Sequence, residues 1–267
     1  AVSDNVILRV AEIHGNHGVS EIIPTVYPST IGLMRENIQT IKDAMLLQER
    51  EGQKGAKIVG INLEGPFLNP ARCGALNADS FIVPDESGLS ALLEGFEDVV
   101  RIITISPELD GAPALIKTMS GMGIIVSMGH SDATYSEAEE GFNSGAQGIT
   151  HIFNAMRGIH HREPGIAGFG LMNRDVYIEV IADPFHLDPK LIESIFSIKN
   201  PERIIIISDT VKETKTEAVS DGIMNGEGRL VGGSLAVTES AERLIKAGID
   251  KGTVMKAISN NPERYLQ

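Results

Sequence analysis

The chain has 267 residues, a formal net charge of −13, 42% hydrophobic residues and one cysteine, Cys73. Its length allows one buried core of about the size of an α/β barrel, while its acidic balance argues against a nucleic-acid partner, which would need clustered Lys and Arg. No apolar run reaches the roughly 18 residues of a membrane span, and one cysteine excludes an internal disulfide, so we expect a cytoplasmic protein without a membrane partner.

Apolar or β-branched runs alternate with helix-like stretches along the whole chain. Buried parallel strands read as continuous hydrophobic runs, and helical segments between them indicate βαβ units. The runs cover residues 22–27, 58–63, 101–105, 124–129, 177–182 and 204–208, with a weaker seventh at 148–149. The residues that follow these runs include Glu64, Ser106, His130, Thr150, His151, Asp183 and Asp209.

The intervening segments have helical patterns. Residues 29–48 carry apolar residues at close to a 3.6-residue period, and Pro189 after Asp188 suits the first turn of a helix. Further helices are expected over residues 4–17, 136–143 and 234–246. Residues 210–233 are polar and glycine-rich, and their Asn225-Gly226 pair predicts a hairpin that could cover the site.

This alternation predicts a (β/α)8 barrel, in which the active site lies where the C-terminal ends of the strands meet. Only seven strands can be counted, and the segment before the first one is helical. We therefore expect these 267 residues to form one barrel domain that lacks its first strand.

One carboxylate and two imidazoles at the ends of separate strands suggest a metal site. Glu64, His130 and His151 would hold one divalent ion of the Zn, Fe or Co type with an open position for water. The ion lowers the pKa of bound water from about 15.7 to about 7. Asp209 would then act as the general base.

Each of these residues also has a structural interpretation. Glu64 could be a buried carboxylate bonded to backbone amides, His130 could adjoin a helix cap, and Asp209 could be an N-cap. The metal site is favoured because all four residues follow strands that meet at one rim.

The remaining histidines and one arginine divide into two groups. His14 and His17 lie in or just beyond the first helical segment and are expected to be structural. His186 follows a strand and is a candidate for substrate contact. Arg162 could pair with Glu163 or capture a phosphate or a carboxylate.

The motifs LEGPFLNP with CGALN, GHSDA, THIFNAM, HHREPG, IADPFH, ISDT and NNPERYL together resemble N-acetylglucosamine-6-phosphate deacetylases of the amidohydrolase superfamily. The resemblance covers nearly all of residues 10–267. It implies a (β/α)8 barrel that normally carries a small β-sandwich built from both chain ends. It also implies hydrolysis of the acetamide of N-acetyl-D-glucosamine 6-phosphate to D-glucosamine 6-phosphate and acetate.

Carried over by position, the resemblance assigns the metal to Glu64, His130 and His151 and the proton transfer to Asp209. It also implies a homodimer, in which the phosphate-binding arginine tends to reach across the interface. The substrate contacts that it implies are Ala75, Asn154 and Ala155 for the sugar and Arg162 and His186 for the phosphate.

Two departures from the family pattern leave alternatives open. The first barrel strand and the flanking sandwich are expected to be absent from these residues, so no second metal site can be built from them. Leu76 stands where several relatives place a histidine or another polar residue beside the substrate carbonyl, which would cost about 10² to 10³ in rate. The alternatives are a deacetylase for another N-acetyl amino sugar and a sugar-phosphate-binding protein with a lapsed active site.

Overall fold

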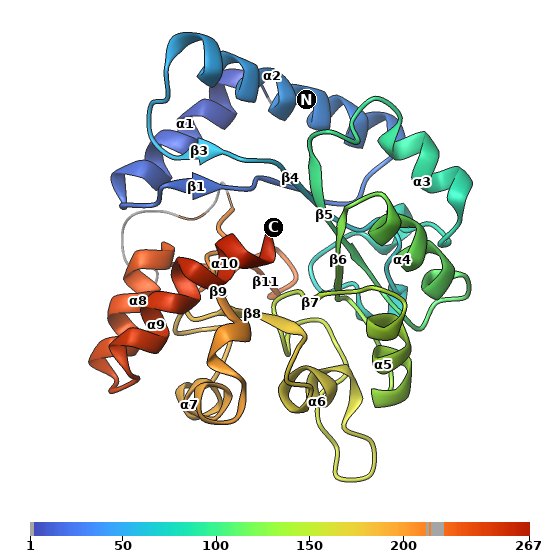
Figure 1. Cartoon of the computed structure of the whole chain (residues 1–267), viewed down its shortest axis with the longest axis vertical. Helices are drawn as coiled ribbons and strands as arrows, with labels where there is room; N and C mark the ends of the chain where they lie inside the picture. Colours follow the sequence, from blue (N-terminus) through green and yellow to red (C-terminus); the bar gives the residue numbers. More distant parts are fainter. Residues whose placement is uncertain (1–2, 212–213, 215–221) are drawn as a thin grey trace.

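A computed structural model describes residues 3–211, 214 and 222–267 (Figure 1). Seven parallel strands form one curled sheet in the order β2-β4-β5-β6-β7-β8-β9, and the helices other than α10 lie outside it. In the part of the chain that is described, β2 and β9 do not pair, so the barrel is incomplete as predicted. The strands of this sheet are β2 (Thr25–Val26), β4 (Ile61–Glu64), β5 (Val100–Ile105), β6 (Ile125–Met128), β7 (Gly148–Ile149), β8 (Tyr177–Ile181) and β9 (Ile204–Ile207).

The helices have recognisable start signals. The side chain of Thr30 caps α2, Thr134 and Glu137 form a capping box on α5, and Asp188 caps α7 ahead of Pro189. Short 3-10 turns cover Pro70–Arg72, Ala78–Ser80 and Pro201–Arg203. The helices are α1 (Asp4–Asn16), α2 (Ile31–Glu51), α3 (Glu86–Leu93), α4 (Ala112–Gly121), α5 (Tyr135–Asn143), α6 (Gly165–Met172), α7 (Pro189–Ile198), α8 (Val237–Lys246), α9 (Lys251–Ile258) and α10 (Asn260–Tyr265).

The first two predicted strands are each divided in the structure. The run 22–27 forms β1 (Glu21–Ile22) and β2, while 58–63 forms β3 (Lys57–Ile58) and β4. β1 pairs with β3 and β2 pairs with β4, both in parallel. Pro24 lies at the break, and because proline has no N–H it cannot donate to a strand ladder. The prediction of two unbroken strands was therefore wrong.

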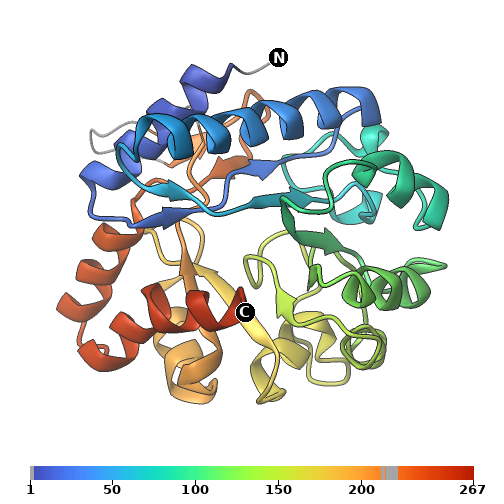
Figure 2. The ribbon, with the colours of Figure 1, turned by 45° about the horizontal axis from the view of Figure 1, so that its top comes forward.

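The inner face of the sheet is layered. Near the starts of the strands, an apolar cluster contains Ile102, Ile125, Tyr177 and Ile205 together with Tyr265 from α10. Figure 2 shows α10 lying across this end of the strands. Two residues further along the strands the layer is polar: Thr150 Oγ1 lies 2.9 Å from Thr104 Oγ1 and donates to Ser127 Oγ at 2.7 Å. The C-terminal rim lies above this polar layer.

The predicted hairpin is present in the described residues. β10 (Ile223–Met224) and β11 (Leu230–Gly232) pair in antiparallel around Asn225 and Gly226. Arg229 Nη1 donates to the carbonyl oxygen of Gly74 at 2.7 Å, so the hairpin contacts the loop that contains Ala75. Residues 212–213 and 215–221 of the predicted excursion lie outside the described residues. Among the helices described, none is long and apolar enough to cross a membrane.

Candidate functional site

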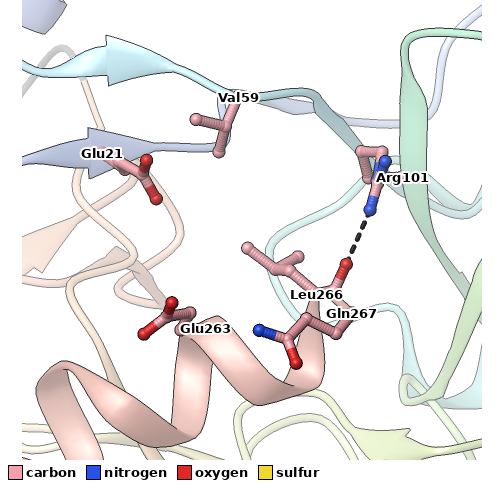
Figure 3. A pocket seen from close by; sticks show the side chains of 6 residues that line it. All are labelled: Glu21, Val59, Arg101, Glu263, Leu266 and Gln267. Atoms are coloured by element: carbon pink, nitrogen blue, oxygen red, sulfur yellow. Dashed lines mark hydrogen bonds between the residues drawn. The ribbon is translucent and has the colours of Figure 1, made fainter.

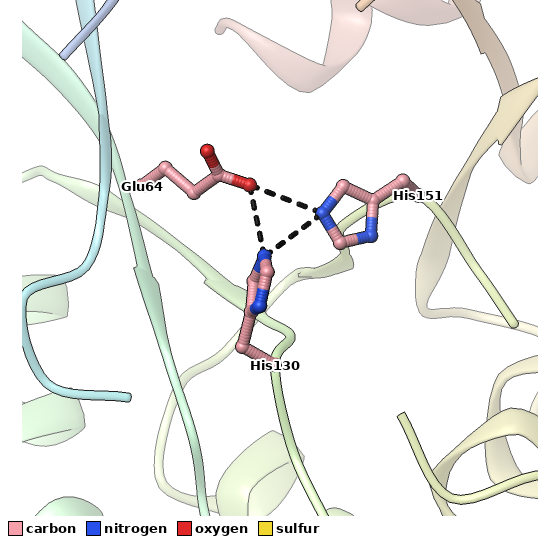
Figure 4. A group of neighbouring side chains, drawn as sticks. All are labelled: Glu64, His130 and His151. Atoms are coloured by element: carbon pink, nitrogen blue, oxygen red, sulfur yellow. Dashed lines mark hydrogen bonds and ion pairs between the residues drawn. The ribbon is translucent and has the colours of Figure 1, made fainter. Parts of the chain in front are cut away.

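Glu64, His130 and His151 meet at the C-terminal rim of the sheet (Figure 4). Glu64 ends β4, while His130 and His151 follow β6 and β7. His130 Nε2 lies 2.9 Å and His151 Nε2 lies 3.1 Å from Glu64 Oε1, and the two ring nitrogens are 3.2 Å apart. The structure thus brings together three side chains that the sequence separates by up to 87 positions.

The spacing and chemistry of these atoms fit a divalent cation. A tetrahedral zinc ion with ligands at about 2.0–2.1 Å separates its ligand atoms by about 3.3 Å. The three separations observed are close to that value. His130 Nδ1 lies 3.0 Å from the carbonyl oxygen of Arg72, which can only accept, so Nδ1 carries the hydrogen. His130 Nε2 is then left with a lone pair that faces the cluster.

Three of the four strand-end residues have left-handed backbone conformations. The φ angles are 46° at His130, 31° at His151 and 48° at Asp209. Such angles are uncommon outside glycine and cluster at functional sites. The backbone around His151 is held by hydrogen bonds, because its carbonyl accepts from the backbone N–H of Asn154 at 3.0 Å and from the amide of the same residue at 3.1 Å.

The electrostatics of the cluster favour ion pairing inside the rim. Burial alone would raise the pKa of Glu64, but the contacts of its carboxylate with the imidazoles of His130 and His151 outweigh burial and hold that pKa well below its usual range. For His151, burial acts to lower the pKa, and the bond to Glu64 and its charge outweigh this and raise the pKa to about 9.

Asp209 follows β9 and has the electrostatic character of a general base. Burial raises the pKa of Asp209 to about 6, the charge of Glu64 adds to the rise, and the charges of His151 and His186 oppose it. A carboxylate with this pKa can take up and release a proton near neutral pH.

The purely structural roles considered for Glu64, His130 and Asp209 were wrong. Glu64 bonds to imidazoles instead of backbone amides. The helix after His130 is capped by Thr134, while Ser131 donates to Glu108 at 2.7 Å. Asp209 precedes a β-bridge between Thr210 and Gly233, and in the described residues after it the first helix begins at Val237.

Two predicted sugar contacts, Asn154 and Ala155, lie in the loop that follows His151. Asn154 uses its amide to donate to the carbonyl oxygens of His151 and Ile152. A Cβ atom placed on Gly74 would lie 3.1 Å from Ala155 Cβ and 3.5 Å from His130 Cε1. The loop with Gly74, Ala75 and Leu76 therefore packs against Ala155 and His130.

Arg162 lies on an exposed loop before α6. Its Nη1 lies 2.9 Å from His161 Nε2. Glu163 instead accepts from the backbone N–H groups of Tyr135 and Gly165, at 2.8 and 3.0 Å. The interpretation of Arg162 as the ion-pair partner of Glu163 was therefore wrong.

The remaining histidines have distinct surroundings. His186 Nδ1 lies 3.0 and 3.1 Å from the two carboxylate oxygens of Asp183, and both side chains are almost fully buried. His14 lies in α1 with its Nε2 3.3 Å from Thr210 Oγ1, so it approaches the residue next to Asp209. His17 lies just beyond α1, 4.0 Å from Glu239.

Sequence reasoning missed Glu179, which lies within β8 on the same face of the strand as Tyr177. Burial raises the pKa of Glu179 to about 7, and the charge of His151 opposes the rise. Its backbone carbonyl accepts from Ile152 N–H at 2.8 Å, directly after His151. The sequence does carry a signal for Glu179, because it is the one charged residue inside the otherwise apolar run 177–182.

A separate pocket of about 210 Å³ lies at the other end of the strands (Figure 3). Arg101, the second residue of β5, donates there to the carbonyl oxygen of Leu266 at 2.6 Å. This pocket is therefore distinct from the rim that holds Glu64. Its lining residues are Glu21, Val59, Arg101, Glu263, Leu266 and Gln267.

No family model matches the chain, but individual proteins do. It is 27% identical to an N-acetylgalactosamine-6-phosphate deacetylase of Escherichia coli O157:H7, over 98% of this chain and 72% of that protein. It is 33% and 35% identical to N-acetylglucosamine-6-phosphate deacetylases of Lysinibacillus sphaericus and Danio rerio, over 71% and 73% of this chain. The chain spans about half the length of the last two, 47% and 48%.

Solved structures of N-acetylglucosamine-6-phosphate deacetylases also match the chain. The crystal structure of N-acetyl-D-glucosamine-6-phosphate deacetylase from Mycobacterium smegmatis matches with a TM-score of 0.90 and 27% identity, over 99% of this chain and 72% of that one. A mutant of that protein in complex with N-acetyl-D-glucosamine-6-phosphate matches with a TM-score of 0.88, at the same identity and coverage. The deacetylase from Thermotoga maritima matches with a TM-score of 0.86 and 25% identity, over 97% of this chain and 72% of that one.

Proposed function

The chain belongs to the amino-sugar-6-phosphate deacetylase family, and we propose that it hydrolyses the acetamide of N-acetyl-D-glucosamine 6-phosphate to D-glucosamine 6-phosphate and acetate. The observation that carries this proposal is the convergence of Glu64, His130 and His151 at the C-terminal rim. Several homologues named for this reaction support the choice of substrate. As a working unit, residues 1–267 would form one catalytic domain that acts in the cytoplasm.

Glu64, His130 and His151 would hold one divalent cation of the Zn, Fe or Co type. When bound, such a cation acts as a Lewis acid on the acetyl oxygen and lowers the pKa of water to about 7. Asp209 accepts a proton from the attacking water and then donates it to the leaving amine. Its raised pKa suits both steps, since the group must be basic first and acidic afterwards.

The substrate would be held by two groups of residues. Ala75, Asn154 and Ala155 lie in the loops that pack beside His130 and would contact the sugar. Arg162 and His186 would bind the phosphate, in keeping with the affinity of arginine for phosphate oxygens. Arg162 is exposed, which suits a homodimer in which it serves the site of the partner.

The test is acetate release by the metal-loaded protein and by Asp209→Asn. We expect the variant to lose about 10² to 10⁴ in kcat, because a positioned general base contributes that much. Asp250→Asn is the matched control, because it changes an exposed cap of α9 for a residue that caps equally well. Equal rates for the wild type and Asp209→Asn would remove Asp209 from the mechanism.

A second candidate substrate is N-acetylgalactosamine 6-phosphate. The Escherichia coli relative named for that substrate aligns with 98% of this chain, a larger share than the two glucosamine relatives described above. The two sugars differ only in the orientation of one hydroxyl group. A higher kcat/KM for the galactose epimer in the same assay would select this alternative.

A third candidate is a sugar-phosphate-binding protein without turnover, motivated by Leu76. This residue lies in the loop that packs against Ala155 and His130, where its N–H donates to the carbonyl oxygen of Cys73 at 3.0 Å. Metal analysis of the purified protein discriminates between a metal-dependent deacetylase and a binding protein. Sugar-phosphate binding without metal and without acetate release would favour the binding protein.

A further inference from the structure

The carboxylate of Asp183 is a buried hydrogen-bonding centre just beyond β8. Its Oδ1 accepts from the backbone N–H groups of Phe185 and His186, both at 2.9 Å. Its Oδ2 accepts from the N–H of Ser234 at 3.0 Å and from the hydroxyl of the same residue at 3.1 Å. His186 Nδ1 approaches both oxygens. One side chain therefore organises two separate rim loops.

These contacts determine which nitrogen of His186 carries a hydrogen. The side chain of Asp183 is 2% exposed, and that of His186 is 6% exposed. An ionised carboxylate can only accept hydrogen bonds, so Nδ1 of His186 must donate. In the neutral ring Nε2 is then the atom with the free lone pair, and it points away from Asp183.

The same carboxylate also sets the position of His186 relative to Asp209. The N–H of Gly233 donates to the backbone carbonyl of Asp209 at 2.7 Å. The next N–H along the chain, that of Ser234, donates to Asp183. Two consecutive peptide groups therefore tie the carboxylate that holds His186 to the strand end that carries Asp209.

We propose that Asp183 is a positioning residue, which holds His186 in the Nδ1–H tautomer and directs its Nε2 atom at the phosphorylated sugar. The inference rests on the proposed function for the identity of that ligand. In the neutral ring Nε2 accepts from a sugar hydroxyl. In the protonated ring Nε2 donates to a phosphate oxygen while Nδ1 still donates to the carboxylate of Asp183, whose charge balances that of the ring. Asp183 itself does not touch the substrate, because its oxygens are occupied by the donors named above.

The variant that tests the proposal is Asp183→Asn. With its oxygen in the place of Oδ1, the asparagine still accepts the N–H groups of Phe185 and His186. Its amide group then stands in the place of Oδ2, 3.0 Å from His186 Nδ1, and donates to that nitrogen. We therefore expect Nδ1 to become an acceptor and the ring hydrogen to move to Nε2. Ser234→Ala is the matched control, since it removes one hydrogen bond to the same carboxylate and leaves the contact to His186 in place.

Two measurements on the full chain decide the question. Nitrogen-15 NMR should show the Nδ1–H tautomer of His186 in the wild type and in Ser234→Ala, and the Nε2–H tautomer in Asp183→Asn. Steady-state acetate release should show KM raised about 10-fold or more by Asp183→Asn with a smaller change in kcat, by analogy with the loss of a carboxylate that orients a metal-ligating histidine. Ser234→Ala should change either constant less than about threefold.

The proposal is overturned if the wild type has the Nε2–H tautomer, a result that does not require any variant to fold. It is also overturned if Ser234→Ala raises KM as much as Asp183→Asn does. Failure of the proposed function is a different outcome, since the wild type would then release no acetate while the tautomer of His186 would still be measurable.

Discussion

His130 Nδ1 lies 3.0 Å from the carbonyl oxygen of Arg72, and the guanidinium of Arg72 pairs in turn with Asp132. Asp132 also pairs with Arg157 at 2.7 Å, in the loop that follows His151. The carboxylate of Asp132, two residues after His130, thereby joins the loop that follows Glu64 to the loop that follows His151. Partners that orient a ligating histidine typically change metal affinity by 10 to 100-fold.

Asp132→Asn should therefore weaken metal binding by about 10-fold while the protein remains folded. The ion pairs of Asp132 are about one-third exposed, and such pairs contribute about 0–1 kcal/mol each to stability. Competition with a chelator measures the affinity, and urea unfolding measures the stability. Asp98→Asn, which removes the pair with Lys42, is the control. Unchanged metal affinity in Asp132→Asn would show that the carbonyl of Arg72 is held by other contacts.

Glu64→Gln should abolish stoichiometric metal binding. The substitution removes the negative ligand and also the charge that raises the pKa of His151 to about 9. We expect metal content below about one-tenth of the wild-type value by elemental analysis, since a structural or catalytic site of this kind needs a deprotonated ligand set. In the metal-free variant, NMR titration should give a pKa of His151 below 9.

Glu49→Gln, an exposed change on α2, is the control for both measurements. Full metal content in Glu64→Gln would mean that the three-residue cluster is not the metal site.

Much of the site could be predicted because it depends on strand order alone. Glu64, His130 and His151 each follow an apolar run, and parallel strands bring such positions to one rim. The ties between loops, such as Arg72 to Asp132, could not be predicted. Their pairing depends on the relative placement of loops that lie 60 residues apart.

The start of α8 shows how a tertiary contact can override a local signal. The apolar residues of 234–246 predict a helix over that whole range, and Ser234 also has the chemistry of an N-cap. In the structure its hydroxyl and N–H both donate to Asp183. The helix begins at Val237 instead, and the carboxylate of Glu239 accepts from the N–H of Ala236 at 2.8 Å. A buried acceptor elsewhere in the fold thus moved the boundary by three residues.

Lys199→Met should lower stability in a pH-dependent way. Lys199 is buried, and its Nζ donates to the carbonyl oxygens of Gly170 and Asn173 at 2.7 and 2.5 Å, at the end of α6. Without the amine, two carbonyls lose a partner, and we expect a loss of about 1–3 kcal/mol in the free energy of unfolding.

The pH dependence follows from the shifted pKa of Lys199. Burial lowers that pKa to about 7, from 10.5, so between these values the unfolded state binds more protons than the folded state. Wild-type stability should therefore rise with pH across this window, and the rise should be absent from the variant. Urea unfolding at pH 7 and pH 9 measures both effects. Lys190→Met, at an exposed lysine, is the control, and an equal loss there would contradict the prediction.

Asp209→Asn should stabilise the metal-free protein even though it removes the proposed base. Burial and the charge of Glu64 raise the pKa of Asp209 to about 6, from 3.8. Between these values the folded state binds more protons than the unfolded state, so stability falls as pH rises through the window. Above about pH 6 the ionised carboxylate costs on the order of 2–3 kcal/mol, and asparagine avoids this cost because it does not titrate.

Thermal unfolding in a chelator should give the Asp209→Asn variant the higher Tm at pH 7.5, with the difference shrinking below about pH 4. The same Tm for both proteins at pH 7.5 would show that the carboxylate is solvated in the folded state, and would remove the physical basis for its action as a base near neutral pH.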